Sequence, residues 1–455
     1  MRLDAIPLAW KRRITDGGLT LAATVALMLP ALYNGFPLVF HDTGAYLARA
    51  FQSQLEPGRG PFYGFLIAAS GGYVSLWPVI VLQAGATVWL IALTLRLHGV
   101  AGRRALLLAV FLLSALTGAA WGTATLMPDA FSPLVVLGWY LLAFGANRLA
   151  RTELVGIAAL LLLAALVHVT HLALLLGLAL CPGIPLLIRH KMHRAGVLLA
   201  AGLPLAALLV IPLINGLVSD RFGFTPGGES FVFGRLVQSG LIERYLDEHC
   251  PDGTIRLCNY RGSLPETGDS WLWDVDSPFY SLGGWEGYAG EMRRLTTASL
   301  ADHPWLHLRS AALATTEQLV RVGVGEDIDS PTWHTDAEIG ARLPQLLPDF
   351  LGARQHDGQL GRLTSLLNKL YVPATLAALA ALSALLLVTL WRGHGRGLPA
   401  TVALALLGNA VLCGVFSGPH DRYQSRIAWL AGLTVIVGID EARRRVKGSA
   451  QPGEK

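Results

Sequence analysis

The chain has 455 residues, of which 53% are hydrophobic and 15% are charged, and its mean hydropathy is +0.48. A water-soluble fold this apolar would aggregate, so the composition excludes an ordinary soluble protein and indicates a membrane protein. The formal net charge of +5 calls for no nucleic-acid partner, because basic residues in short connections between apolar stretches set orientation in a membrane.

Long apolar runs recur along the chain, and a run of about 20 residues crosses the roughly 30 Å hydrocarbon layer as a helix. There are about ten of them, so the sequence predicts an all-α polytopic membrane protein. The first lacks a small-residue cleavage site and is interpreted as an uncleaved anchor. The runs cover residues 18–40, 73–95, 105–126, 129–147, 154–168, 172–188, 195–217, 371–390, 400–416 and 427–439.

Basic residues occupy every second connection, and Lys and Arg in short loops stay on the cytoplasmic side. Both termini are therefore predicted to be cytoplasmic, in a multi-pass protein of the plasma (inner) membrane. The basic connections lie at 11–13, 96–104, 148–151, 189–194, 392–396 and 443–447. Four regions follow: an N-terminal bundle of about seven spans (1–217) with a first outer loop (41–72), an extracytoplasmic segment (218–370), about three C-terminal spans (371–440) and a cytoplasmic tail (441–455).

The first outer loop begins with His41 and Asp42, directly after the first apolar run. An acid at the bilayer centre costs roughly 2.5 to 3.5 kcal/mol, so an acid at the end of a span indicates the lip of a cavity. There Asp42 would act as a base or as a metal ligand. A structural alternative is that Asp42 or Thr43 caps a short helix through residues 45–48.

Asp129 and a pair of histidines are the next polar groups along the chain. Asp129 follows Pro128 at the start of the fourth run, where it either caps the helix or faces substrate. His168 and His171 are three residues apart and share a face if the helix continues through them.

The sequence leaves the cofactor open, and a divalent cation is one alternative. The histidines His41, His168, His171 and His420, with Asp42, Asp129 and Asp421, would bind it only if four separate loops converge. The other reading is that these side chains form hydrogen bonds in a wet cavity.

The large outer segment is the only soluble-like stretch, and it is predicted to be mainly helical. Two or three helices are expected on the membrane surface, one within 231–249 and one opened by Pro304. Cys250 and Cys258 are predicted to form a disulfide rather than a redox pair or a metal site. The aromatic residues of this segment are similar to sugar-stacking surfaces, but an ordinary place at the membrane interface is the favoured reading.

The last outer loop contains His420, Asp421, Arg422 and Tyr423, just before the final run. The predicted topology puts this loop on the same side as Asp42.

The order of these elements resembles the GT-C superfamily of glycosyltransferases. The resemblance rests on the acid after the first span, the Arg-x-Pro-Phe-Tyr element from Arg59 to Tyr63, the Pro-Asp pair at the fourth span and the late Arg-Tyr pair. It covers the first seven spans in outline and the final element. One departure is that many members carry two neighbouring acids in the first loop, whereas here Asp42 adjoins His41 and the next acid is Glu56.

The resemblance implies transfer of a hexosyl or pentosyl group from a polyprenyl-phosphate donor to an extracytoplasmic acceptor. It places the base on Asp42. Arg59 and Arg422 would then neutralise the donor phosphate, which a planar guanidinium contacts through two parallel hydrogen bonds, and anchoring to lipid headgroups is the alternative for both. The candidates for binding substrate are His41, Arg59, Tyr63, Asp129, His168, His171, His420, Asp421, Arg422 and Tyr423. The expected partners are membrane lipid and the lipid-linked donor. A transporter or flippase for a lipid-linked substrate and a non-catalytic assembly protein are the alternatives; few ionisable groups at mid-membrane count against transport.

Overall fold

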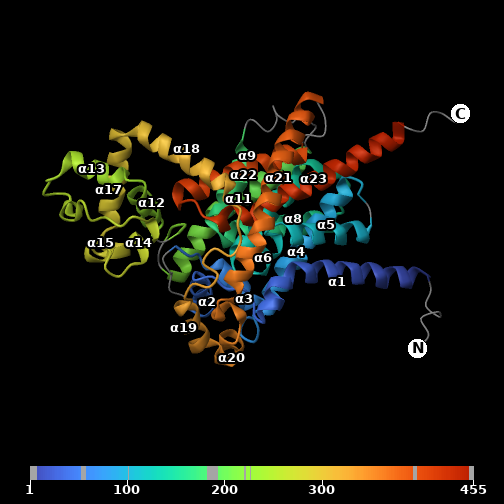
Figure 1. The fold of residues 1–455 in the computed structure, drawn as a ribbon, viewed down its shortest axis with the longest axis horizontal. Coiled ribbons are helices and arrows are strands. Elements are labelled where there is room, and N and C mark those ends of the chain that lie inside the picture. The colour runs from blue at the N-terminus through green and yellow to red at the C-terminus, as the bar shows by residue number, and fades with distance from the viewer. Residues whose placement is uncertain are drawn as a thin grey trace.

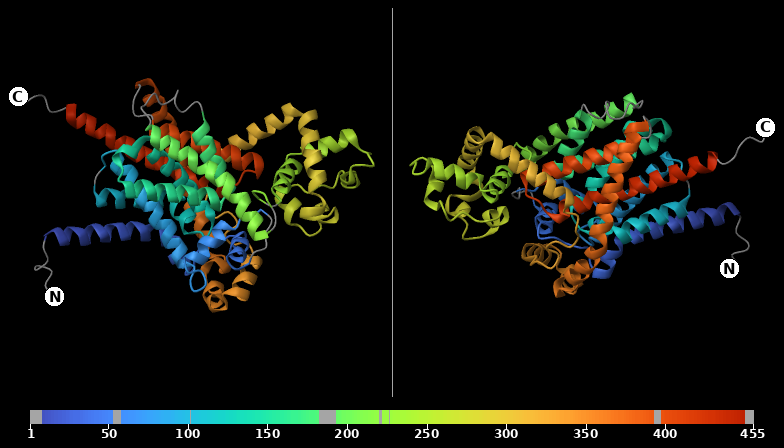
Figure 2. Two further views of the ribbon diagram at one scale, coloured as in Figure 1. Left: turned by 180° about the vertical axis from the view of Figure 1, so that it is seen from behind. Right: turned by 45° about the horizontal axis from the view of Figure 1, so that its top comes forward.

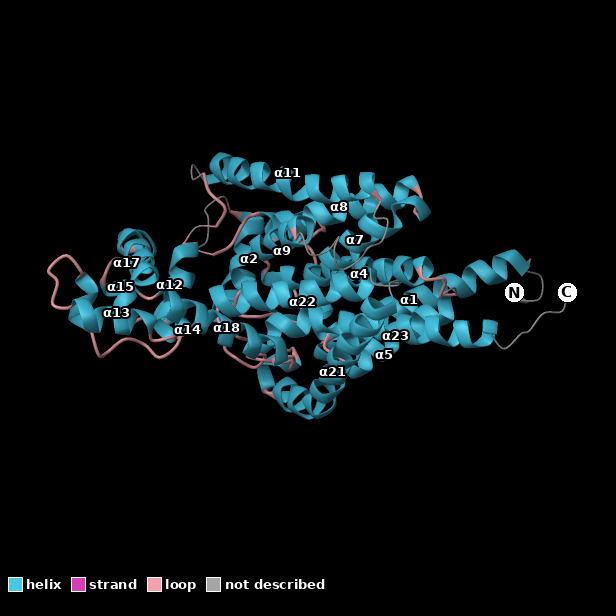
Figure 3. Ribbon diagram, turned by 90° about the horizontal axis from the view of Figure 1, so that it is seen from above, coloured by secondary structure: helices cyan, strands magenta, loops and turns pink. Residues whose placement is uncertain are grey.

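The computed structural model describes residues 8–52, 58–100, 102–181, 193–219, 222–225, 227–392 and 397–449. Over these residues the chain is helical, and its β-type pairing is limited to the isolated bridge between Leu38 and Thr125 (Figure 3). Six described helices are long and apolar enough to cross a membrane, so the general class is an all-α membrane protein. They are Asp16–Asn34, Trp77–Leu97, Pro128–Arg148, Arg194–Val218, Gln359–Trp391 and Gly397–Phe416.

The other four predicted spans do not form continuous apolar helices of this length. Within 105–126 the helix breaks at Thr117, whose hydroxyl donates to the Leu113 carbonyl and whose backbone is extended. The helices nearest to these predicted spans are α5 (Arg103–Leu116), α6 (Ala119–Ala124), α8 (Arg151–Val167), α9 (Val169–Leu180) and α23 (Asp421–Ser449). Residues 182–188 of the predicted sixth span lie outside the described residues.

The centre of the bundle is formed by helices that are apolar on every side. In α7 (Ser132–Gly145) nearly every residue is buried, and it packs against α4 (Trp77–Leu97) and α22 (Gly397–Phe416). A helix that is apolar all round lies inside a bundle rather than at its edge. The helix α18 (Pro304–Val320) crosses α22 closely, because Gly414 has no Cβ; a Cβ there would lie 2.7 Å from the Ala314 carbonyl oxygen.

The first half of the outer segment forms a separate lobe with its own hydrophobic core. The lobe lies at one end of the molecule, and both chain ends lie toward the other end (Figures 1 and 2). The predicted helix within 231–249 is two helices, because the chain turns at Gly240 with a φ of 71°. The lobe helices are α12 (Gly228–Gln238), α13 (Leu241–His249), α14 (Gly268–Trp273), α15 (Pro278–Ser281), α16 (Gly284–Gly287) and α17 (Ala289–Asp302).

The second half of the outer segment packs on the bundle instead. Its helices α19 (Trp333–Arg342) and α20 (Leu347–Leu351) lie beside α2 (Thr43–Phe51) and α3 (Phe62–Ala69) (Figure 1). Gln355 accepts from the Val39 amide at 3.1 Å and donates to the Val39 carbonyl at 2.6 Å. This clamp fixes the extended residues 36–40 that lead into the first outer loop.

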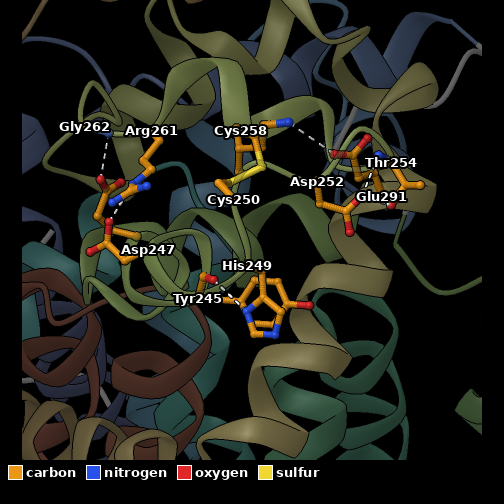
Figure 4. The surroundings of a disulfide bond; sticks show 12 residues. Tyr245, Asp247, His249, Cys250, Asp252, Thr254, Cys258, Arg261, Gly262 and Glu291 are labelled. Carbon is orange, nitrogen blue, oxygen red and sulfur yellow. Dashed lines mark hydrogen bonds and ion pairs between the residues drawn. A yellow bond between two sulfur atoms is a disulfide. The ribbon is translucent and has the colours of Figure 1, made fainter.

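The predicted disulfide between Cys250 and Cys258 is present, at the edge of the lobe core (Figure 4). Polar contacts on either side hold the same loop. Arg261 Nε donates to Asp247 at 2.7 Å, and the Thr254 amide donates to Asp252 at 2.8 Å. Of the two other cysteines, Cys181 is partly exposed and Cys413 is buried.

Replacing both disulfide cysteines by serine should destabilise the lobe by about 2.5 kcal/mol, because the bond closes a short loop and removes entropy from the unfolded chain. Urea-dependent protease cleavage of the lobe, read by mass spectrometry, measures the loss. Cys181→Ala, which keeps the disulfide, should stay within about 0.5 kcal/mol of the parent. Equal cleavage of the parent and the double-serine variant would contradict a stabilising role for the bond.

Candidate functional site

A cavity of about 580 Å³ lies between the bundle and the lobe, and it brings together side chains from opposite ends of the chain. Its walls come from the start of α2, the start of α9, the facing ends of α22 and α23, and the lobe helices α12 and α14. The predicted site residues that line it are His41, Asp42, Arg59, Asp129, His168, Arg422 and Tyr423. Groups almost 400 positions apart thus share one enclosed volume, as Asp42 and Arg422 do across a separation of 380.

Asp42 occupies the position just before α2 but makes no capping hydrogen bond with its side chain. Its carboxylate forms an ion pair with Arg59 and a second with Arg422, whose Nη2 lies 3.3 Å from Oδ2. Thr43 carries the local structure instead: its hydroxyl accepts from the Phe40 amide at 2.9 Å and donates to the Leu126 carbonyl at 3.2 Å. The structure therefore separates the two roles, with Thr43 shaping the turn and Asp42 facing the cavity.

The two arginines determine the charge of Asp42. Burial by itself would raise the pKa of this carboxyl, but the Arg59 and Arg422 charges outweigh burial and hold the pKa well below its usual range. Burial lowers the pKa of His41, although the Asp42 charge opposes the shift. At neutral pH the loop therefore contributes a carboxylate and an uncharged imidazole.

Asp129 pairs with an arginine that the sequence analysis did not single out. It follows Pro128 at the start of a helical turn, as predicted, but its side chain makes no capping bond and lies 2.5 Å from Arg426 Nη1. Arg426 is 4% exposed, and its Nη2 also contacts Asn409 Oδ1 at 3.0 Å and Cys413 Sγ at 3.2 Å. The spacing of Arg422 and Arg426, four residues apart in a helix, was the signal that both reach the same face.

The floor of the cavity, formed by Asp42, Asp129, Arg59, Arg422 and Arg426, has an excess of positive charge and of hydrogen-bond donors. Its three guanidinium groups face two carboxylates, whereas the third carboxylate of the cavity lining, Asp269, belongs to the lobe and is 67% exposed. Among the described residues, Arg59 Nε, Arg422 Nη1 and Arg426 Nε are buried without any hydrogen-bond partner. A buried donor left unpaired costs about 1 to 3 kcal/mol, and more when charged, so this floor favours an anionic ligand that accepts these hydrogens.

Aromatic rings hold two of these arginines in place. The Arg422 guanidinium carbon lies 4.0 Å from the centre of the Phe40 ring and 4.8 Å from that of Tyr423. The Arg59 guanidinium lies 5.8 Å from the Tyr46 ring centre. Stacking on a ring face restricts the planar group without using its donors, which stay available to a ligand.

Two residues predicted to bind substrate lie instead in the packed interior. His171 is 1% exposed, with Nε2 at 2.8 Å from the Ser132 hydroxyl and Nδ1 at 3.0 Å from the Ala164 carbonyl. The Tyr63 hydroxyl is buried and donates to Gln83 at 2.7 Å. Both side chains form hydrogen bonds inside the bundle, so they position helices and do not line the cavity.

The last outer loop is divided in the same way. Asp421 faces away from the cavity and accepts from the Gly323 amide at 3.1 Å. His420 lies between the lobe and the bundle, with Nδ1 3.1 Å from Glu326 and Nε2 3.9 Å from Asp269. In this predicted cluster of four residues, Arg422 and Tyr423 line the cavity. His420 and Asp421 instead hold the loop that contains Gly323 and Glu326 against the start of α23.

The histidines do not assemble the donor set expected for a divalent cation. The helix breaks at His168, which precedes α9 and accepts from the Thr170 amide at 3.2 Å, so His168 and His171 do not share one continuous helix face. Within the described ranges no group of three or more His, Cys, Asp or Glu side chains is arranged to hold a metal ion.

Two smaller cavities lie near the charged floor. A pocket of about 80 Å³ shares Asp129, Arg422 and Arg426 with the main cavity, and Trp121 also lines it. Trp121 and apolar residues of α1 (Leu8–Asn34), α5 and α21 (Gln359–Arg392) line a groove of about 260 Å³.

Comparison of the chain with protein-family models, with curated proteins and with solved structures finds no match.

Proposed function

We propose that the chain is an integral-membrane glycosyltransferase of the GT-C type, which moves a sugar from a polyprenyl-phosphate donor to an acceptor outside the cytoplasm. The observation that carries the proposal is the convergence of Asp42 with three partly unpaired arginines in one cavity. A lipid phosphate is the anion that such a floor suits in a membrane protein. The order of sequence elements that resembles the superfamily supports the same reading.

In the proposed reaction Arg59 and Arg422 bind the donor phosphate. Their move toward the phosphate weakens both ion pairs to Asp42, and the carboxylate regains the basicity that these pairs suppress. Asp42 then accepts the proton of the acceptor hydroxyl. The acceptor oxygen forms a bond to the anomeric carbon, the bond from that carbon to the phosphate oxygen breaks, and polyprenyl phosphate leaves, with inversion at the carbon.

The apolar groove beside Trp121 supports a lipid-borne donor. Among its lining residues, Leu29 and Phe111 are 52% and 56% exposed, as expected for side chains that contact lipid. A prenyl chain in this groove would bring its phosphate toward Arg422 and Arg426 through the small shared pocket. Asp129 would keep Arg426 oriented at that entrance.

We also propose about ten membrane crossings, in which α5 with α6, α8, α9 and α23 join the six long apolar helices. Both termini would be cytoplasmic and the lobe extracytoplasmic, at the plasma (inner) membrane. The position of the lobe opposite the two chain ends supports this orientation (Figures 1 and 2). The disulfide supports an oxidising compartment for the lobe.

The direct test supplies purified protein with radiolabelled polyprenyl-phosphate sugar and an extracytoplasmic lipid fraction as acceptor. Arg59→Gln and Arg422→Gln should each lower kcat/KM by about 10- to 100-fold, because each removes a charge-assisted hydrogen bond to phosphate. Arg309→Gln, an exposed arginine of α18, is the matched control and should retain the parent rate. Movement of the intact donor across vesicles without any transfer would favour a flippase instead.

A further inference from the structure

A second and larger cavity, of about 980 Å³, lies at the opposite end of the helix bundle. Both cavities touch α22: Cys413 and Phe416 near its end line the candidate site, whereas Gly397 and Leu398 at its start line the second cavity. The helix has 20 residues, and a rise of 1.5 Å per residue separates the two ends by about 30 Å. The second cavity is therefore independent of the proposed transfer site.

One wall of this cavity is held by a closed set of polar contacts. His98 Nδ1 lies 2.7 Å from Glu441, and His98 Nε2 lies 2.9 Å from the Tyr140 hydroxyl. Arg444 donates to the His98 carbonyl at 2.6 Å. Glu441 is the one carboxylate among the described lining residues, and its contact with His98 fixes its position.

Three arginines also line this cavity, and two of them have no carboxylate partner among the described residues. Arg96 is neutralised by Glu153 through two hydrogen bonds of 2.8 and 2.6 Å. Arg148 donates one hydrogen bond, at 3.3 Å, to the Leu97 carbonyl. Arg194 has no hydrogen bond or ion pair to the part of the chain that the structure describes. Arg148 and Arg194 together therefore give the cavity an unbalanced positive charge.

Neutral donors add to these charges. His193 Nδ1 accepts from the Gly196 amide at 3.2 Å, so the neutral ring carries its proton on Nε2 and remains a donor. Asn147, beside Arg148, contributes an amide to the lining. Apolar residues such as Phe144 and Leu149 complete the walls. A cavity lined by cationic donors, neutral donors and apolar side chains matches a phosphate group that is attached to an apolar chain.

We propose that this second cavity binds a phosphate-bearing anion through Arg148 and Arg194, with the headgroup of an anionic phospholipid and free phosphate as the two sources of that chemistry. Basic residues that only set membrane orientation act through the charge of a whole surface, and any arginine on that surface would serve. A cavity site instead depends on the two arginines that line it. This difference makes the proposal testable with charge-matched variants.

The experiment measures the melting temperature of the purified full chain in detergent micelles while phosphatidylglycerol or inorganic phosphate is titrated, with phosphatidylcholine as the blank. The parent should be stabilised at saturating anion. In Arg148→Gln/Arg194→Gln the half-saturating concentration should rise by about 20-fold, as expected for the loss of two basic contacts. Arg103→Gln/Arg104→Gln removes equal charge from exposed arginines at the start of α5 that do not line the cavity, and it should stay within about twofold of the parent.

The outcomes distinguish a lipid headgroup from free phosphate, and two of them would overturn the proposal. Stabilisation by phosphatidylglycerol without an effect of phosphate assigns a lipid headgroup, and stabilisation by both assigns phosphate itself. If neither anion raises the melting temperature, the cavity is no phosphate site. If the Arg103→Gln/Arg104→Gln variant loses as much affinity for the anion as the Arg148→Gln/Arg194→Gln variant, the effect comes from the surface charge and the proposal is overturned.

Discussion

Asp42→Asn should lower kcat for sugar transfer by about 10²- to 10⁴-fold, the range that loss of a general base produces. Asparagine keeps the shape of the side chain but neither accepts the proton of the acceptor hydroxyl nor balances Arg59 and Arg422. The assay is transfer from a labelled polyprenyl-phosphate sugar by the purified protein. Since the donor phosphate meets the arginines rather than Asp42, KM for the donor should change much less than kcat.

Two further variants distinguish catalysis from folding. Asp42→Glu retains the charge and should fold like the parent, while its longer side chain misplaces the base and lowers kcat. Asp276→Asn alters an exposed carboxylate of the lobe that does not line the cavity, and it should leave kcat unchanged. Parent-like transfer by Asp42→Asn, in protein that elutes as a single folded species, would remove Asp42 from the mechanism.

Asp129→Asn should cost about 3 to 5 kcal/mol of folding free energy, because it leaves the guanidinium of Arg426 buried without its counter-charge. Arg426→Gln should cost a similar amount for the reverse reason. The double variant Asp129→Asn/Arg426→Gln should be more stable than the sum of the two single effects predicts, by about 2 kcal/mol. Unfolding by detergent titration measures the folding free energy of the parent, the two single variants and the double variant.

The matched control is the exposed ion pair of Arg244 and Glu248, whose side chains are 58% and 39% exposed. Water solvates both partners, so Arg244→Gln should change stability by no more than about 0.5 kcal/mol. If Asp129→Asn is as mild as Arg244→Gln, the Asp129 pair is solvated and does not organise the cavity floor.

Composition and the length of the apolar runs were sufficient to predict the helical membrane class. Two cysteines in the outer segment were sufficient to predict the disulfide. Spacing between apolar runs overestimated how many form one unbroken helix, because the backbone becomes extended at Thr117 within 105–126 and no hydropathy pattern records such a break. The resemblance to a known superfamily pointed to Asp42, Arg59 and Arg422. Their convergence depends on packing between helices, which neither motif spacing nor topology specifies.

The interactions that complete the site could not be predicted from the sequence for the same reason. In the sequence Arg426 stands between the last outer loop and the final apolar run, and its pairing with Asp129 is visible only in the structure. Gln355 belongs to a segment without a motif, yet it fixes the residues before Asp42 through a contact across 316 positions. The outer segment also read as one domain, whereas its two halves have separate hydrophobic environments, since apolar content does not reveal which partner covers it.

The clamp from Gln355 to Val39 has a consequence for biosynthesis. The loop that carries Asp42 leaves the ribosome early, but the side chain that fixes its approach and the Arg422 that pairs with it are made more than 300 residues later. Insertion of the first helices therefore precedes completion of the charged floor. A nascent chain stalled before the last third would hold an acid-bearing loop without its late partners, so the site matures only at the close of translation.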